Sequence, residues 1–447
     1  MRRIPILCLA FGLSLLLSAS AQRRSFVPAV LISIDGLKPD YVLEADRHGL
    51  KIPNLRRFLK EGAYASAVTG VTPTVTYPSH TTLVTGVSPA KHGIYANTPL
   101  DPFSKNQGGW YWYAEDIRVP TLWDACAAAG LKTASVDWPV TVSAKIDFNI
   151  VQMWRAATPD DRKLIRALST PGLLTEAERA IGNYPEGYDY TVEADKRRAA
   201  FNVYLLETKR PAFLTTYFAG LDEVEHEHGP NSPEAYAALE EIDALVGKVR
   251  AAAEKLGNGK AIIAIASDHG FAPISKTLNL NAAFREAGLV EIEAGKVKSW
   301  RAITWNSGGT AAVMLKDTAD QDARAKVRAI LQRLAADSSS GLLKFYEGEA
   351  ARNLGGFPDA AFVVGTKPGV YIGGGFDLPL VRDIKPGGGH GFLAELPEMD
   401  SSFFIIGAGI PAGKNLGRMD MRDIAPTLAE LLGVKLPMAE GRNRLNR

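Results

Sequence analysis

The chain has 447 residues, 46% of them hydrophobic and 22% charged, a composition typical of a globular protein rather than a disordered or low-complexity one. Its 51 basic and 49 acidic residues nearly cancel, which argues against a general binder of nucleic-acid duplexes or anionic membranes. The charge balance does not exclude a small anionic substrate, because bound metal ions can supply positive charge locally.

The first predicted element is a targeting segment. Two arginines precede an apolar run over residues 4–17, and Ala19-Ser20-Ala21 then supplies a cleavage pattern. An uncleaved anchor is the alternative, but the run is shorter than the roughly 20 residues that a spanning helix needs, and no later segment is longer. We therefore expect a signal peptide over 1–21, an exported protein (periplasmic or secreted) with no membrane span in its mature part, and a catalytic domain over 22–447.

An alternation of strands and helices follows. Continuous apolar runs, typical of parallel strands buried on both faces, lie at 29–34, 213–218, 261–266 and 402–406. Helical patterns lie at 121–129, 233–256 (with Ser232 as N-cap) and 420–432. This rhythm predicts an α/β sandwich around a mostly parallel sheet. Two regions, about 147–195 and 278–386, fit it poorly, and we interpret them as inserted cap segments.

Acidic residues stand where several predicted strands end. Asp35, Asp222 and the pair Asp268-His269 each follow one of the apolar runs. In open α/β sheets, ligands bind beyond the carboxyl ends of the strands, so these side chains are expected to meet there. Cys126, by contrast, lies in an alanine-rich helical pattern and is interpreted as a buried apolar residue, not a nucleophile.

Histidines complete a metal-ligand pattern. His226 follows Asp222 by four residues, and His390 stands among the glycines of 387–391. Each piece alone has an ordinary alternative: a surface pair on a helix, or a loop residue. Together, three aspartates and three histidines suffice for two metal ions, and these nitrogen and oxygen donors favour zinc, although manganese or iron could bind similar sites.

The segment over 72–86 predicts a loop that enters a helix at Pro78. A hydroxyl just before a helix N-terminus suits attack on phosphate, because free N–H groups and the helix dipole favour an anion there. The alternative is that Thr76 only caps the helix.

This segment carries a family resemblance. Thr-Val-Thr-Tyr-Pro-Ser-His-Thr-Thr-Leu-Val-Thr-Gly (74–86), followed by Pro89-Ala-Lys-His-Gly-Ile-Tyr-Ala-Asn97, resembles the nucleotide pyrophosphatase/phosphodiesterase family of the alkaline phosphatase superfamily. The likeness continues through Trp138-Pro139, 220–222 with 226–230, 267–271, 390–392, 395–399 and 423–433, in the family's order. It implies an alkaline-phosphatase-like fold over nearly the whole mature chain.

The resemblance also implies roles for named residues. Asp35, Thr76, Asp268 and His269 would hold one zinc, and Asp222, His226 and His390 the other. Thr76 would attack phosphorus and form a covalent phosphothreonine, and Asn97 would hydrogen-bond a non-bridging phosphate oxygen. His80, His92 and His228 match family positions but are expected to serve local hydrogen bonding.

The substrate is expected to be a phosphodiester or a pyrophosphate. By the resemblance, Tyr77 and Tyr217 would sandwich a nucleobase, with Trp110 or Trp112 as a further wall; core packing is the alternative for all four. Tyr77 and Ser79 stand where the family often has Phe and Asn. The segment 135–139 has no Lys-x-Arg of the kind expected beside a doubly charged monoester.

The sequence is also compatible with other functions. A phosphate monoesterase, or a phosphonate or phospholipid hydrolase, would share the metals and differ in the pocket. A metal-stabilised binding protein without turnover is the non-enzyme alternative. The oligomeric state and the physiological substrate are not predicted.

Overall fold

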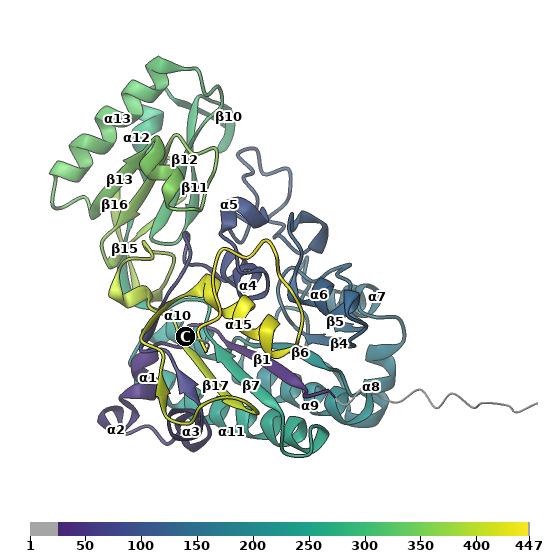
Figure 1. Ribbon diagram of the computed structural model, residues 1–447. Helices are drawn as coiled ribbons and strands as arrows, with labels where there is room; N and C mark the ends of the chain where they lie inside the picture. Colours follow the sequence, from purple (N-terminus) through teal and green to yellow (C-terminus); the bar gives the residue numbers. More distant parts are fainter. Residues whose placement is uncertain (1–25, 446–447) are drawn as a thin grey trace, which may run out of the picture.

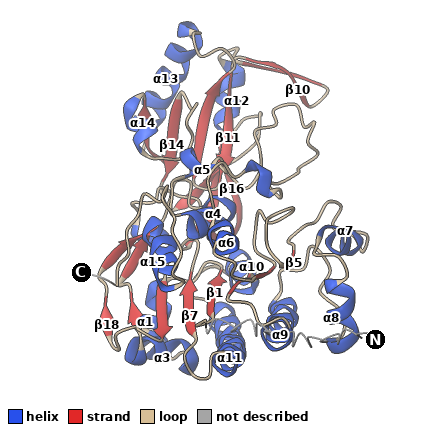
Figure 2. Cartoon of the chain, turned by 45° about the vertical axis from the view of Figure 1, so that its right-hand side comes forward, coloured by secondary structure: helices blue, strands red, loops and turns tan. Residues whose placement is uncertain are grey.

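The computed structural model describes residues 26–445, so the predicted signal peptide lies outside the described part. Its centre is an eight-stranded sheet, flanked by helices (Figures 1 and 2). In spatial order the strands are β18 (Lys414–Asn415), β2 (Ala63–Tyr64), β17 (Phe403–Gly407), β7 (Ile262–Ala266), β1 (Ala29–Ile34), β6 (Phe213–Phe218), β4 (Thr133–Val136) and β5 (Phe148–Ile150). Strands β7, β1, β6, β4 and β5 run parallel, whereas β17 is antiparallel to β7, so the sheet is mostly parallel, as predicted.

The continuous apolar run of β1 has a direct cause. Val30, Ile32 and Ile34 belong to the hydrophobic core on one face of the sheet, and Leu31 belongs to the core on the other. All four are at most 1% exposed. Because successive side chains point to opposite faces, a strand covered on both sides must be apolar at every position.

Two layers of helices cover these faces. One face carries α3 (Pro53–Glu61), α9 (Val192–Thr208) and α11 (Pro233–Leu256), and the other carries α4 (Thr76–Thr85), α6 (Leu122–Ala128) and α15 (Ile424–Leu431). The α/β sandwich is therefore confirmed. Shorter elements are α1 (Pro39–Leu43), α2 (Ala45–His48), α5 (Pro89–His92), α7 (Asp161–Leu168), α8 (Leu173–Ile181), α10 (Gly220–His228), β3 (Ala67–Thr69), β19 (Arg418–Asp420) and the 3₁₀ turns η1 (Ala114–Asp116), η2 (Pro397–Met399) and η3 (Met421–Asp423).

A smaller lobe stands beyond the carboxyl edge of the sheet (Figure 1, green). It has its own core, around Phe284, Val313 and Phe362. Its elements are β8 (Ala272–Leu278), α12 (Leu280–Glu286), β9 (Val290–Glu293), β10 (Lys296–Trp300), β11 (Ala302–Ser307), β12 (Thr310–Leu315), α13 (Gln321–Ala336), β13 (Leu342–Glu347), α14 (Glu349–Asn353), β14 (Phe362–Thr366), β15 (Gly369–Ile372) and β16 (Val381–Gly389). The segment 278–386 lies in this lobe, whereas 147–195 supplies β5, α7 and α8 at one edge of the central sheet.

Three local predictions can be compared with the structure. Helix α11 has the predicted bounds, and the Ser232 hydroxyl caps it by accepting from Ala235 N at 3.2 Å. The helix predicted to begin at Pro78 begins at Thr76, so that boundary is wrong. The helix predicted over 420–432 divides into η3 and α15, and Asp420 and Asp423 form a capping box at the start of η3.

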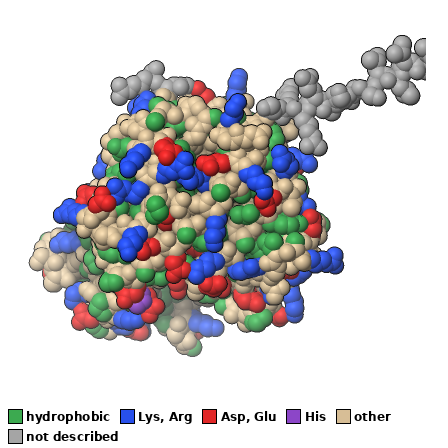
Figure 3. Space-filling view, turned by 90° about the horizontal axis from the view of Figure 1, so that it is seen from below, with side chains coloured by type: hydrophobic (Ala, Val, Ile, Leu, Met, Phe, Trp, Pro, Cys, Tyr) green, Lys and Arg blue, Asp and Glu red, His purple; other side chains and the backbone are tan. Residues whose placement is uncertain are grey.

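The surface seen in Figure 3 carries lysine and arginine intermixed with aspartate and glutamate, without a continuous basic area on that face. Within residues 26–445, no helix combines the length and apolar character that crossing a membrane requires. Cys126 is fully buried, as predicted, and burial raises the pKa of its thiol to about 12.

Candidate active site

The carboxyl edge of the central sheet brings the first group of candidate ligands together. Asp35 directly follows β1, and Asp268 and His269 follow the neighbouring strand β7. His269 Nε2 lies 3.2 Å from Asp35 Oδ1 and 3.3 Å from Asp268 Oδ2. All three residues are buried, so the adjacent parallel strands assemble the cluster that their ends predicted.

The second group comes from α10 and from the end of β16. Asp222 and His226 lie one turn apart on α10, with Asp222 Oδ2 3.3 Å from His226 Nε2. Strand β16 passes close beside this helix: a Cβ at Gly387 would lie 2.4 Å from the His226 carbonyl oxygen. The glycines before His390 are therefore needed to let the strand approach α10.

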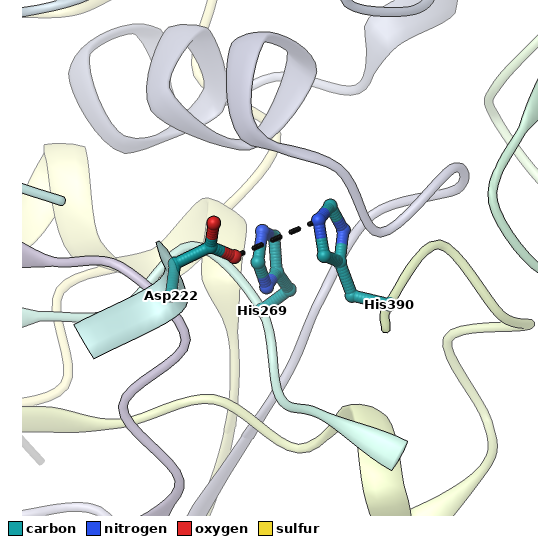
Figure 4. A group of neighbouring side chains, drawn as sticks. All are labelled: Asp222, His269 and His390. Atoms are coloured by element: carbon teal, nitrogen blue, oxygen red, sulfur yellow. Dashed lines mark ion pairs between the residues drawn. The ribbon is translucent and has the colours of Figure 1, made fainter. Parts of the chain in front are cut away.

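His390 joins the two groups (Figure 4). Its Nε2 lies 3.7 Å from Asp222 Oδ1, and its ring stacks on that of His269 with centroids 3.7 Å apart and an interplanar angle of 8°. Donor atoms of Asp35, Asp268 and His269 lie within 4.8 Å of one another, as do those of Asp222, His269 and His390. His226 lies beside the cluster of Asp222, His269 and His390, with its Nε2 3.3 Å from Asp222 Oδ2.

Proton positions in these clusters follow from the backbone. The Nδ1 atoms of His226, His269 and His390 lie 3.1–3.2 Å from the carbonyl oxygens of Gly388, Gly270 and Thr74, respectively. A carbonyl oxygen only accepts, so each Nδ1 carries the proton and each neutral ring presents an Nε2 lone pair. Those lone pairs face carboxyl oxygens of Asp35, Asp222 and Asp268.

This arrangement fits divalent cations. Buried atoms without a hydrogen-bond partner in the described chain include Asp35 Oδ1, Asp222 Oδ1, Asp268 Oδ2 and His269 Nε2. Burial, and then the neighbouring carboxylates, raises the pKa of Asp35, Asp222 and Asp268 well above their usual range. Burial also lowers the pKa of His390 to about 3. Carboxylates and neutral imidazoles converge here with their lone pairs unmet, which is the donor set that zinc prefers.

Thr76 stands at the first turn of α4. Val75, not Thr76, occupies the N-cap position and makes no side-chain capping bond, so the capping alternative for Thr76 is wrong. The Thr76 carbonyl accepts a hydrogen bond from His80 Nδ1 at 2.8 Å, one turn along the helix. His92 likewise bonds locally, with Ile94 N and Thr82 Oγ1, whereas His228 lies at the surface beside Glu227.

Asn97 faces the same helix end. The Tyr77 backbone N–H donates to Asn97 Oδ1 at 2.9 Å. An N–H only donates, so the amide oxygen must face it, and the two Nδ2 donors are left for another acceptor. Asn97 and Thr76 line one cavity, so these donors suit an anion held at the helix N-terminus.

That cavity has a volume of about 180 Å³. Its walls combine the predicted residues with four that the sequence did not reveal: Gln152, Trp154, Tyr190 and Ala219. The lining residues are Asp35, Thr76, Tyr77, Asn97, Trp110, Gln152, Trp154, Tyr190, Tyr217, Ala219, Asp222, His226 and His390. Asp268 and His269 lie behind this surface.

The two tyrosines are more constrained than predicted. The Tyr217 hydroxyl donates to Asp35 Oδ2, and its ring packs edge-on against His80 with centroids 4.7 Å apart. The Tyr77 hydroxyl donates to Gln152 Oε1 at 2.8 Å, and its ring meets Trp110. Both tyrosines are at most 4% exposed. Trp110 lines the cavity, whereas Trp112 packs behind it against Trp154.

Comparison with known proteins places this site in context. The family "Type I phosphodiesterase / nucleotide pyrophosphatase" matches residues 29–392. An uncharacterized pyrophosphatase/phosphodiesterase of Schizosaccharomyces pombe is 28% identical over 255 residues, which are 55% of this chain and 45% of that protein. The human bis(5′-adenosyl)-triphosphatase is 25% identical over 255 residues, 56% of this chain and 49% of that protein. The chain thus spans less than half the length of these curated relatives.

A solved structure shares the fold. Murine ectonucleotide pyrophosphatase/phosphodiesterase 5, an inactive variant in complex with AMP, superposes with a TM-score of 0.66 at 19% identity. The match covers 93% of this chain and 97% of that one. The alkaline-phosphatase-like α/β fold is therefore shown along nearly the whole chain.

Proposed function

Because the chain belongs to the type I phosphodiesterase/nucleotide pyrophosphatase family, we propose that it hydrolyses phosphodiester or pyrophosphate bonds in nucleotide-type substrates. Thr76 is the proposed nucleophile, and two divalent cations, zinc by the chemistry of the donors, complete the site. The observation that carries the proposal is one cavity lined by Thr76, Asn97 and four of the six candidate ligands.

The cations would be held by two sets of residues. Asp35, Asp268 and His269, with Thr76, form one set, and Asp222, His226 and His390 form the other. When bound, two such ions neutralise charge on the attacking and leaving oxygens of an in-line displacement.

The protein's own groups then account for two chemical steps. The Thr76 hydroxyl releases its proton to solvent as Oγ1 attacks phosphorus, and the bond to the leaving oxygen breaks, so that the leaving group departs as an anion. A covalent phosphothreonine that still carries the nucleoside forms. Asn97 Nδ2 and the N–H groups at the start of α4 hydrogen-bond the non-bridging oxygens as charge develops on them. In the second step water attacks the same phosphorus, the bond between phosphorus and Thr76 Oγ1 breaks, and the nucleotide is released. A proton from the water passes to Thr76 Oγ1 and restores the hydroxyl.

The walls of the cavity favour a diester over a monoester. Among its lining residues in the described chain there is no lysine or arginine to meet the second negative charge of a monoester. The buried guanidinium of Arg198 lies between Asp137 and Asp195, which balance its charge. A singly charged phosphodiester needs no such partner.

The same walls offer aromatic contacts for a base. Trp110, Trp154 and Tyr190 line the cavity beside Tyr77. Since the Tyr77 and Tyr217 side chains are at most 4% exposed, whereas Trp110 and Tyr190 are only partly buried, we propose that Trp110 and Tyr190, with Trp154, supply most of the stacking surface. The murine structure of similar fold binds AMP, which suits a cavity of this kind.

A paired rate assay tests this function. The zinc-loaded protein is given the nitrophenyl ester of thymidine monophosphate and, separately, nitrophenyl phosphate, and kcat/KM is compared. We expect the nucleotide diester to be preferred by at least about 100-fold, equivalent to about 2.7 kcal/mol in the transition state. A preference for nitrophenyl phosphate would leave the metal site in place and make the protein a phosphate monoesterase.

A further inference from the structure

A buried network of charged and polar side chains connects α10, the helix that bears Asp222 and His226, to the cavity wall. Its centre is Arg198 of α9, which is 1% exposed. Arg198 Nη1 donates to Asp195 Oδ1 at 2.9 Å, and Arg198 Nε lies 2.8 Å from Asp137 Oδ2. A buried guanidinium with a carboxylate on each side is costly to assemble, so its position in the fold calls for an explanation.

On one side, this network ends at the start of α10. Asp195 Oδ2 accepts from Gly220 N at 2.8 Å, and Asp195 Oδ1 accepts from Ala219 N at 3.2 Å. These are the first free N–H groups of the helix that bears Asp222 and His226. The fully buried Asp195 carboxylate therefore caps that helix from a neighbouring element and fixes where its first turn lies.

On the other side, the network ends at the wall of the cavity. Asp137 accepts from the Tyr184 hydroxyl at 3.3 Å and interacts with the Gln152 side chain. Gln152, which is 2% exposed, accepts from the hydroxyl of Tyr77, the residue after Thr76. The same set of contacts thus reaches both α10 and the first turn of α4.

We propose that Asp195, held by Arg198, which Asp137 holds in turn, is a positioning residue that sets the Asp222–His226 half of the metal site in register with the nucleophile side of the cavity. It touches neither substrate nor metal and acts through the backbone of α10. The inference rests on the proposed metal site but not on any particular substrate. Removing the carboxylate frees the first turn of α10, and the zinc held there loses the orientation of two of its donors.

A matched control lies elsewhere in the same protein. Asp243 of α11 is 2% exposed and accepts from Asn54 N and Leu55 N at the start of α3. It is therefore another buried carboxylate that caps a neighbouring helix, but α3 bears no candidate ligand. Asp195→Ala and Asp243→Ala remove the same kind of contact, one next to the metal site and one away from it.

The test is a zinc titration of the full chain against a chromophoric chelator, with thermal unfolding followed in parallel. We expect both variants to lower Tm, but only Asp195→Ala to weaken one of the two zinc equivalents, by about 10- to 100-fold, the range for groups that orient metal ligands. The other equivalent keeps its affinity. Arg198 itself is not varied, since its loss would leave two buried carboxylates unpaired.

Asp195→Asn keeps an acceptor for one of the two N–H groups and serves if the alanine variant does not fold. It should weaken the same zinc equivalent by a smaller factor. Wild-type affinity for both equivalents in a folded Asp195 variant would overturn the inference, as would equal weakening in the Asp243 variant. If the wild-type protein binds two zinc ions but cleaves no nucleotide diester, the proposed function fails while this result stands.

Discussion

Thr76→Ala is expected to lower kcat for the nitrophenyl ester of thymidine monophosphate by at least about 10³-fold, as loss of a covalent nucleophile does in other hydrolases. The Thr76 hydroxyl stands at the first turn of α4, in the same cavity as Asn97, Asp35 and Asp222. Of the tyrosine hydroxyls in the cavity lining, those of Tyr77 and Tyr217 already have protein acceptors. Tyr190 also lines the cavity, but only Thr76 carries its hydroxyl in the first turn of a helix. Initial rates at saturating zinc measure the effect.

Thr76→Ser is the matched control. It keeps a hydroxyl at the same backbone position and should retain easily measured turnover, while zinc binding and Tm show that both variants are folded. A Thr76→Ala protein within about tenfold of the wild-type rate would remove Thr76 from the chemistry.

Removal of metal is expected to have the second large effect. Dialysis against a chelator should reduce turnover to background, and re-addition of zinc should restore it. The metal-free protein should also unfold at a lower temperature. If free zinc exceeds its Kd about 1,000-fold, loss of binding costs about 4 kcal/mol, or about 5 °C in Tm for a chain of this length.

Two histidines of α10 allow a matched comparison for this effect. His226→Ala removes a candidate ligand, whereas His228→Ala removes an exposed side chain two residues away that is paired only with glutamates. The first should weaken zinc binding and the second should leave it unchanged. Equal zinc affinity in the two variants would contradict the assignment of His226.

The cluster of candidate ligands could be predicted from the sequence because its residues follow a rule of the fold. Asp35, Asp268 and His269 lie just beyond the ends of adjacent parallel strands, so the ends of the apolar runs predicted their positions. Asp222 and His226 needed only the four-residue spacing of one helical turn. The family resemblance then added Asn97, and it favoured a nucleophile for Thr76, whose local sequence alone suited a helix cap as well.

The residues that form the walls of the cavity could not be predicted from the sequence in the same way. Gln152 and Trp154 lie in the loop before α7, and Tyr190 lies in the loop after α8, so only tertiary packing brings them beside Thr76. Asp195 presents a similar case: its role depends on two N–H groups 24 and 25 residues along the chain. A contact between elements that are distant in sequence produces no local sequence pattern from which it could be predicted.

The stereochemical course at phosphorus tests the central claim most directly. A single diastereomer of the nitrophenyl ester of thymidine 5′-phosphorothioate is hydrolysed in ¹⁸O-labelled water, and the configuration of the product is determined. Attack by Thr76 followed by attack of water comprises two in-line displacements, so we predict overall retention. Inversion would mean that water attacks the substrate directly, and it would contradict the covalent role of Thr76.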